Sequence, residues 1–137
     1  MKKIMFNDRY GLTKAVLNGS KTMTRRIVSE GIIRMAKRDC NICGGELNER
    51  IKEHTLFCYH DTVAIAQSYK TIHEAMMSGD YGDSKYDAFR SAFVAGTKGW
   101  TNKMFVRADL MPYRIKITDI KAERLQDISD EDCLKEE

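Results

Sequence analysis

Residues 18–26, with the sequence NGSKTMTRR, concentrate side chains that can do chemistry. They comprise one glycine, three hydroxyl side chains and three cations among nine positions. Arg26 can hold a phosphate or a base edge by paired hydrogen bonds, and Gly19 lets a ligand approach the backbone closely. The Thr24 hydroxyl becomes a nucleophile when a base about 3 Å away accepts its proton. Lys21 can be that base in its neutral form, which burial or a neighbouring cation favours.

A helix is predicted directly before this stretch, over about residues 9–18. Three apolar side chains recur there at the i, i+3, i+4 spacing of one helix face, namely Leu12, Ala15 and Val16. Asn7 or Asp8 can cap the helix start, and Gly19 stands where helices often end in a left-handed glycine. The chemistry-bearing stretch therefore begins at a helix end.

A strand is predicted after the turn, over residues 22–28, because this segment is rich in β-branched residues. Alternation along a strand would place Thr24 and Arg26 on the same face. The four residues 19–22 read Gly-Ser-Lys-Thr but do not form a phosphate-binding P-loop. That motif needs adjacent glycine and lysine, an earlier glycine and a helix that follows, and none of the three is present.

The stretch resembles the ASCH family. Gly19, Lys21, Thr24 and Arg26 match its Gly-x-Lys-x-x-Thr-x-Arg signature. The segments TVAIAQSY at residues 62–69 and RIKITDIKAERLQDISDED at 114–132 are also similar to phage and bacterial members, as are residues 104–115. The resemblance implies a PUA-like β-barrel and binding of RNA or a modified nucleotide.

One branch of this family hydrolyses the amide of acetylated cytidine with a lysine, a threonine and a glutamate. By motif position the first two are Lys21 and Thr24, and the glutamate is Glu136, with Glu131 or Glu123 as alternatives. The glutamate would deliver a proton to the leaving amine. In the family the last matched helix ends in Glu-Gly, whereas here Glu136 is followed by a second glutamate.

The remaining pattern predicts an α+β protein, a small PUA-like mixed β-barrel with helices packed at its ends. The absence of a regular βαβ rhythm favours this class. Strands are expected over 3–6, 61–69, 103–106 and 113–120, and helices over 71–78, 85–95 and from 129 onward. In the strand at 113–120, alternation points Ile115, Ile117 and Tyr113 inward. Residues 29–60 are interpreted as an insertion within a single domain, 1–137.

The insertion contains a candidate structural zinc site. Cys40 and Cys43 with two following glycines form a knuckle-like turn, and His54 and Cys58 would complete a tetrahedral set. His60 is a substitute ligand. The alternative is that these cysteines are independent reduced thiols, as Cys133 is expected to be.

Two residues elsewhere could bind a base. A base can stack on Trp100, which has cations on both sides in KGWTNK, although core packing is the commoner role of a single tryptophan. Gln67 could hydrogen-bond a base edge from the end of a strand, although most such glutamines are structural.

Composition places the chain among globular proteins. It has 137 residues, 42% hydrophobic and 31% charged, which fits one domain and excludes disorder and fibrous classes. No apolar run is long enough for a membrane helix, and the N-terminus lacks the pattern of a signal peptide. A soluble, cytoplasmic protein with no membrane partner is expected.

The net charge of +3 is mild, but it is unevenly distributed. Residues 1–39 carry ten cations against three acids, a net of +7. Residues 119–137 carry three cations against eight acids, a net of −5. A basic first third can track phosphates, and such binding would depend on salt.

Three functions follow from the sequence and its resemblance. The first is binding of RNA or a modified nucleotide through Lys21, Thr24, Arg26 and Gln67 around one cleft. The second is an amidohydrolase on acetylated cytidine, using Lys21, Thr24 and Glu136. The third is a phage-type module that uses an inherited fold to bind another protein, without catalysis.

Overall fold

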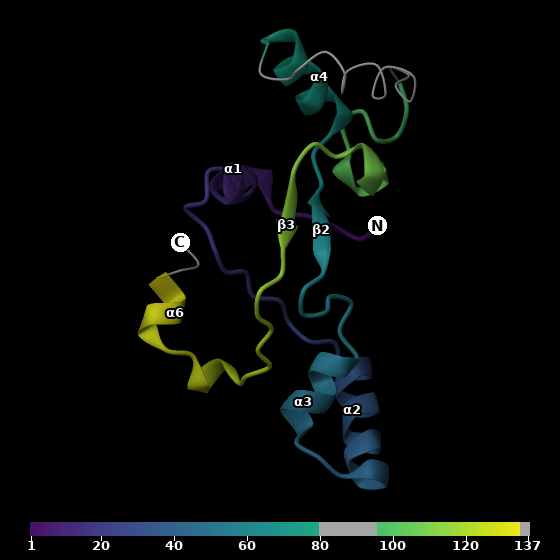
Figure 1. Cartoon of the computed structure of the whole chain (residues 1–137), viewed down its shortest axis with the longest axis vertical. Helices are drawn as coiled ribbons and strands as arrows, with labels where there is room; N and C mark the ends of the chain where they lie inside the picture. The colour runs from purple at the N-terminus through teal and green to yellow at the C-terminus, as the bar shows by residue number, and fades with distance from the viewer. Residues whose placement is uncertain (80–95, 135–137) are drawn as a thin grey trace. The chain divides into compact units, whose positions relative to one another are not determined.

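The computed structural model describes residues 1–79 and 96–134 (Figure 1). Within these ranges a mixed sheet of three strands is present, in the order β1 (Lys3–Ile4), β2 (Thr62–Ile65), β3 (Arg114–Lys116). β1 and β2 are parallel, with Ile4 opposite Ile65. The same ranges contain five α-helices, which confirms the predicted α+β class. The sheet is open, and these three strands do not close into a barrel.

The chain forms two compact units. The first comprises Met1–Thr13 and Thr62–Ile115, and the second comprises Lys14–Asp61 and Lys116–Glu137. Each unit is described separately below.

The core of the first unit lies around β2. Three of its four residues are buried, and the alanine that follows is fully buried. The chain then enters α4 (Tyr69–Met77), where the Ser68 side chain accepts the Thr71 N–H and caps the helix. The helix predicted at 71–78 is therefore confirmed and begins two residues earlier. The core cluster consists of Ala64, Ala66, Tyr69, Ile72, Val106 and Met111.

The segment after residue 102 is not the strand predicted at 103–106. It forms a 3-10 helix at Lys103–Phe105, because the Asn102 side chain accepts the Met104 N–H at 2.9 Å and turns the backbone. A second 3-10 helix follows at Ala108–Leu110. The Lys3 amine fastens this segment to β1 by donating to the carbonyls of Met104 at 2.5 Å and Val106 at 2.6 Å.

The helix predicted over 9–18 is divided in two. Asn7 caps a 3-10 helix at Asp8–Tyr10 by accepting the Arg9 N–H at 3.0 Å. Gly11 then adopts a left-handed φ of 68°, which ends this helix. α1 (Leu12–Leu17) begins at the next residue.

The second unit contains a helical hairpin within residues 29–60, which the sequence analysis interpreted as an insertion. α2 (Glu30–Cys43) is capped by Ser29, and α3 (Leu47–Glu53) packs against it. The Arg50 guanidinium donates to the Gly44 carbonyl at 3.1 and 3.3 Å, and these bonds fix the loop between α2 and α3. The region at 30–53 is therefore a structured element of this unit.

The last strand and helix follow the sequence pattern closely. Ile115 and Ile117 are half-buried between exposed neighbours, which confirms the alternation, but Tyr113 is exposed and its inward placement was wrong. The regular strand is short, because β3 ends at Lys116. α6 (Asp130–Leu134) starts at the predicted position, where Ser129 accepts the Asp132 N–H. The helix predicted at 85–95 lies outside the described residues.

Across residues 1–79 and 96–134, every helix is too short or too polar to cross a membrane.

Candidate functional site

The turn after α1 has the geometry that the sequence predicts. Gly19 has a left-handed φ of 79°, and its N–H donates to the Val16 carbonyl at 3.2 Å. The Lys21 N–H and the Ser20 hydroxyl both donate to the Ala15 carbonyl, at 3.0 and 3.2 Å. These bonds satisfy carbonyls at the helix end and fix the position of Lys21 relative to α1.

The strand predicted over residues 22–28 is absent, and this was an error of the sequence interpretation. These residues form irregular backbone that belongs to none of the three strands described. β-branched residues favour extended backbone, but a strand also needs a hydrogen-bonded neighbour. Exposed and half-buried residues nevertheless alternate from residue 22 to residue 26, as they would on the two faces of a strand. Thr24 and Arg26 are both exposed, whereas the intervening Arg25 is half-buried.

Lys21 is buried, with 5% of its surface exposed. Lysine is rarely buried to this degree in proteins unless it is paired. The segment thus combines one enclosed lysine with two exposed residues, Thr24 and Arg26. All three residues, and Gly19, belong to the second unit.

An acidic residue also reaches this segment. The Glu123 carboxylate lies 4.0 Å from Nε of Arg25, and both side chains are about three quarters buried. Glu123 was one alternative for the acidic position of the site, and the structure places it beside the residue that follows Thr24. Glu136, the first choice, lies outside the described residues. Glu131 is exposed in α6.

Gln67 lies in the first unit, immediately before the cap of α4. It is 9% exposed, and its N–H donates to the Met111 sulfur at 3.3 Å. Its side-chain oxygen Oε1 is buried and accepts no hydrogen bond within the described part of the chain. An unsatisfied buried acceptor costs about 1–3 kcal/mol, so this amide is suited to a partner that brings a donor.

Trp100 also lies in the first unit, where it is half-buried against the core cluster. Its ring centroid is 5.9 Å from that of His73 on α4. The structure thus gives Trp100 a packing role, and stacking of a base on it stays a prediction.

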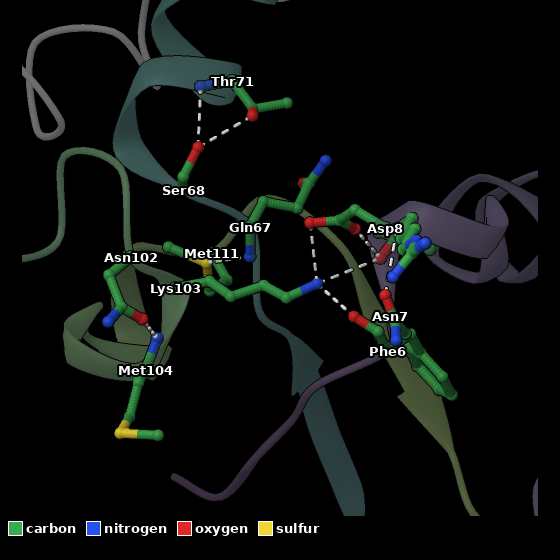
Figure 2. Close-up of polar contacts among 12 residues, drawn as sticks. Phe6, Asn7, Asp8, Gln67, Ser68, Thr71, Asn102, Lys103, Met104 and Met111 are labelled. Atoms are coloured by element: carbon green, nitrogen blue, oxygen red, sulfur yellow. Dashed lines mark hydrogen bonds and ion pairs between the residues drawn. The ribbon is translucent and has the colours of Figure 1, made fainter.

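A polar network that the sequence did not reveal lies at the end of β1 (Figure 2). The Lys103 amine donates to the Phe6 carbonyl, and its nitrogen is 2.8 Å from Oδ2 of Asp8 and 3.4 Å from the Thr13 hydroxyl. Thr13 in turn donates to the other oxygen of Asp8. Asp8 and Lys103 are far apart in the sequence, so no local pattern predicts their pairing.

The network sets the charge of Asp8. Burial acts to raise the pKa of this carboxyl, but hydrogen bonds from Lys103 and Thr13 and the charge of Lys103 outweigh burial and lower the pKa. Asp8 is therefore ionised at neutral pH and can only accept hydrogen bonds.

The candidate zinc ligands have a different local geometry from the predicted knuckle. Cys40 and Cys43 occupy the last turn of α2 rather than a loop, and Cys58 is exposed. Nε2 of His54 lies 2.7 Å from an Asp39 oxygen, which connects the end of α3 to α2. Across the described ranges no three His, Cys, Asp or Glu side chains are grouped as metal ligands. Structural zinc at Cys40, Cys43, His54 and Cys58 stays a prediction.

Comparisons with protein-family models, with curated proteins and with solved structures give no match to this chain.

Proposed function

We propose that this protein binds RNA or a modified nucleotide through residues 19–26, as an ASCH domain with a PUA-like barrel. The observation that supports the proposal is the burial of Lys21 within a segment whose exposed side carries Thr24 and Arg26. The net positive charge of residues 1–39 also supports the proposal, because it favours an anionic ligand.

The segment has two properties that suit an anionic ligand. A cation enclosed by protein acts through a lower effective dielectric than a solvated one, so the charge of Lys21 attracts a nearby phosphate more strongly. Arg26 is exposed and can form paired, charge-assisted hydrogen bonds to phosphate oxygens. Phosphate contacts of this kind position a nucleic acid but carry no sequence information.

The proposal is tested by exchanging one exposed arginine at a time. Arg26→Ala removes a guanidinium inside the segment, and Arg38→Ala removes one from α2, where the Arg38 side chain is 72% exposed. Both variants lose the same charge. With a fluorescent single-stranded RNA, Arg26→Ala is expected to weaken binding about tenfold, the effect of losing one charge-assisted hydrogen bond. It should also reduce the slope of log affinity against log salt by about one. Arg38→Ala should change the affinity and the salt slope much less.

Two results would contradict the proposal. If both variants weaken binding equally, net charge alone attracts the RNA and residues 19–26 are not the site. If the wild-type protein does not retain RNA even at low salt, the protein is not an RNA-binding module.

Hydrolysis of acetylated cytidine and a protein-binding role stay predictions, and Glu136 is outside the described residues. The hydrolase is tested in the same preparation by release of acetate from acetylated cytidine. Thr24→Val keeps the shape of the side chain and removes the hydroxyl, so it should abolish any such release.

A further inference from the structure

The last turn of α2, in the second unit, carries a pair of cysteines. Cys40 and Cys43 lie three positions apart on this helix, and both are free thiols. Residues at this spacing are neighbours on the surface of a helix, with Cβ atoms about 5–6 Å apart. Cys43 is exposed and Cys40 is half-buried, so a reagent that arrives from solvent reaches Cys43 first.

The end of the helix can adjust so that the two thiols join. A disulfide needs Cβ atoms about 3.5–4.5 Å apart, so the last turn of α2 must tighten. Cys43 is the last residue of α2, and the chain continues into Gly44 and Gly45, which both have a positive φ. Glycine has wide backbone freedom, so the adjustment stays within this turn. A disulfide formed in this way is readily reduced again.

Arg50 on α3 brings a positive charge to the same turn. Its guanidinium donates to the Gly44 carbonyl at 3.1 and 3.3 Å and to the Glu53 carboxylate at 3.0 Å. The pKa of Arg50 is raised, first by Glu53 and further by the charges of Cys43 and Cys40. The C-terminal end of a helix disfavours an anion, and a neighbouring cation opposes this effect. Arg50 therefore favours the thiolate, which is the form that attacks a disulfide.

The other two cysteines have different surroundings. The Cys58 N–H donates to an Asp61 carboxylate oxygen at 2.8 Å, which places a negative charge beside this residue. Cys133 follows three acidic residues in α6. Neither has a second cysteine three positions away. Only the pair in α2 combines two neighbouring thiols with a cation.

We propose that Cys40 and Cys43 are a redox pair that glutathione disulfide converts into an intramolecular disulfide. The Cys43 thiolate attacks one sulfur of the reagent, forms a mixed disulfide and releases one glutathione. Cys40 then loses its proton, and its sulfur attacks that of Cys43 and releases the second glutathione. The reagent gains the two electrons that the pair loses, and the two glutathione thiols carry away the two protons. This inference is independent of the proposed function.

Peptide mapping of the full chain tests the proposal. The protein is incubated with glutathione disulfide, the remaining thiols are blocked with iodoacetamide, and the chain is digested with trypsin. Cleavage after Arg38 and Arg50 yields peptide 39–50, which contains Cys40 and Cys43 and no other cysteine. Mass spectrometry should find this peptide two hydrogens lighter, without glutathione and without an alkyl group. Reduced glutathione should reverse the change.

Single substitutions identify the two steps. Cys40→Ser removes the second thiol, so glutathione should stay on Cys43 as a mixed disulfide. Cys43→Ser should react more slowly, because the remaining thiol is half-buried. In the wild-type protein the peptides that contain Cys58 and Cys133 are the internal controls, and they should carry glutathione or the alkyl group.

Two substitutions at Arg50 separate its charge from its role in holding the loop. Arg50→Gln removes the charge and should slow oxidation of the pair about two- to threefold, as expected for one exposed charge. Arg50→Lys keeps the charge and loses the paired bonds to the Gly44 carbonyl, so it should oxidise at close to the wild-type rate. Equal slowing in both variants would show that Arg50 acts by position and not by charge, and would contradict its assigned role.

Three results would overturn the redox pair. The first is a peptide 39–50 that keeps glutathione in the wild-type protein. The second is a disulfide from Cys40 or Cys43 to Cys58. The third is oxidation that proceeds only after a chelator is added, because the thiols would then be metal ligands. None of these results bears on the binding of RNA.

Discussion

At the scale of single residues, Gly99 shows how closely the first unit is packed. A Cβ added there would lie 2.5 Å from Cε2 and 2.9 Å from Cδ2 of Tyr69. The tyrosine ring cannot easily move away, because its hydroxyl accepts the Arg107 N–H at 2.9 Å and its own N–H donates to the Gly99 carbonyl. Position 99 therefore requires glycine for steric reasons.

Gly99→Ala is expected to lower the free energy of unfolding by about 1–3 kcal/mol, the usual effect of forcing extra atoms into a packed site. Urea denaturation measures it. Gly31→Ala is the matched control, because Gly31 lies in α2 and an added Cβ would be no closer than 3.9 Å to its nearest neighbour, the Ser29 oxygen. That control should raise the free energy by up to about 1 kcal/mol, through helix propensity. A neutral Gly99→Ala would show that Tyr69 is not fixed.

Residue types predicted some site features and not others. Gly19 was recognisable because a left-handed glycine follows an amphipathic run, and the structure has it in that conformation. Gln67 was recognisable by its place at a strand end. The pairing of Asp8 with Lys103 was not, because it depends on the tertiary fold.

At the scale of elements, two lysines fasten β1 to the segment at 103–106. Lys3 on β1 donates to carbonyls of that segment, and Lys103 on that segment donates back to Phe6, just after β1. The Asp8 carboxylate is part of the same connection. Because Asp8 is ionisable, this connection should make the stability of the first unit depend on pH.

The sign of this dependence follows from the lowered pKa of Asp8. The unfolded carboxyl has a pKa of about 4, so the contribution is fully present above that pH and is lost as pH falls through the lower folded value. Because the side chain is largely exposed, we expect no more than about 1 kcal/mol. Asp8→Asn should lower stability at pH 7 and leave a smaller difference from wild type near pH 2. An equal deficit at both pH values would contradict this origin.

Local sequence patterns predicted two capped helices nearly in place but also predicted two strands that the described residues do not form. The capped helices that follow Ser68 and Ser129 were predicted nearly in place, because a cap is a local signal. The strands expected at 22–28 and 103–106 were wrong, since extended propensity does not supply a pairing partner. Residues 29–60 were interpreted only as an insertion, and the α2–α3 hairpin within them was not recognised.

At the scale of the whole molecule, the α+β class was predictable and the organisation into two units was not. The class follows from the mixture of periodicities, which is spread along the entire sequence. The two units each combine segments that are distant in sequence, so only tertiary contacts define them. The contrast between a basic first third and an acidic end is also a whole-chain property, and it predicts RNA affinity that falls as salt rises.

Hydrogen exchange of the protein with and without single-stranded RNA tests the central claim most directly. If residues 19–26 bind the backbone of RNA, the amides of this irregular segment should exchange more slowly in the complex, while those of the α2–α3 hairpin should not change. Protection confined to the hairpin, or no protection of residues 19–26 at saturating RNA, would contradict the proposed site.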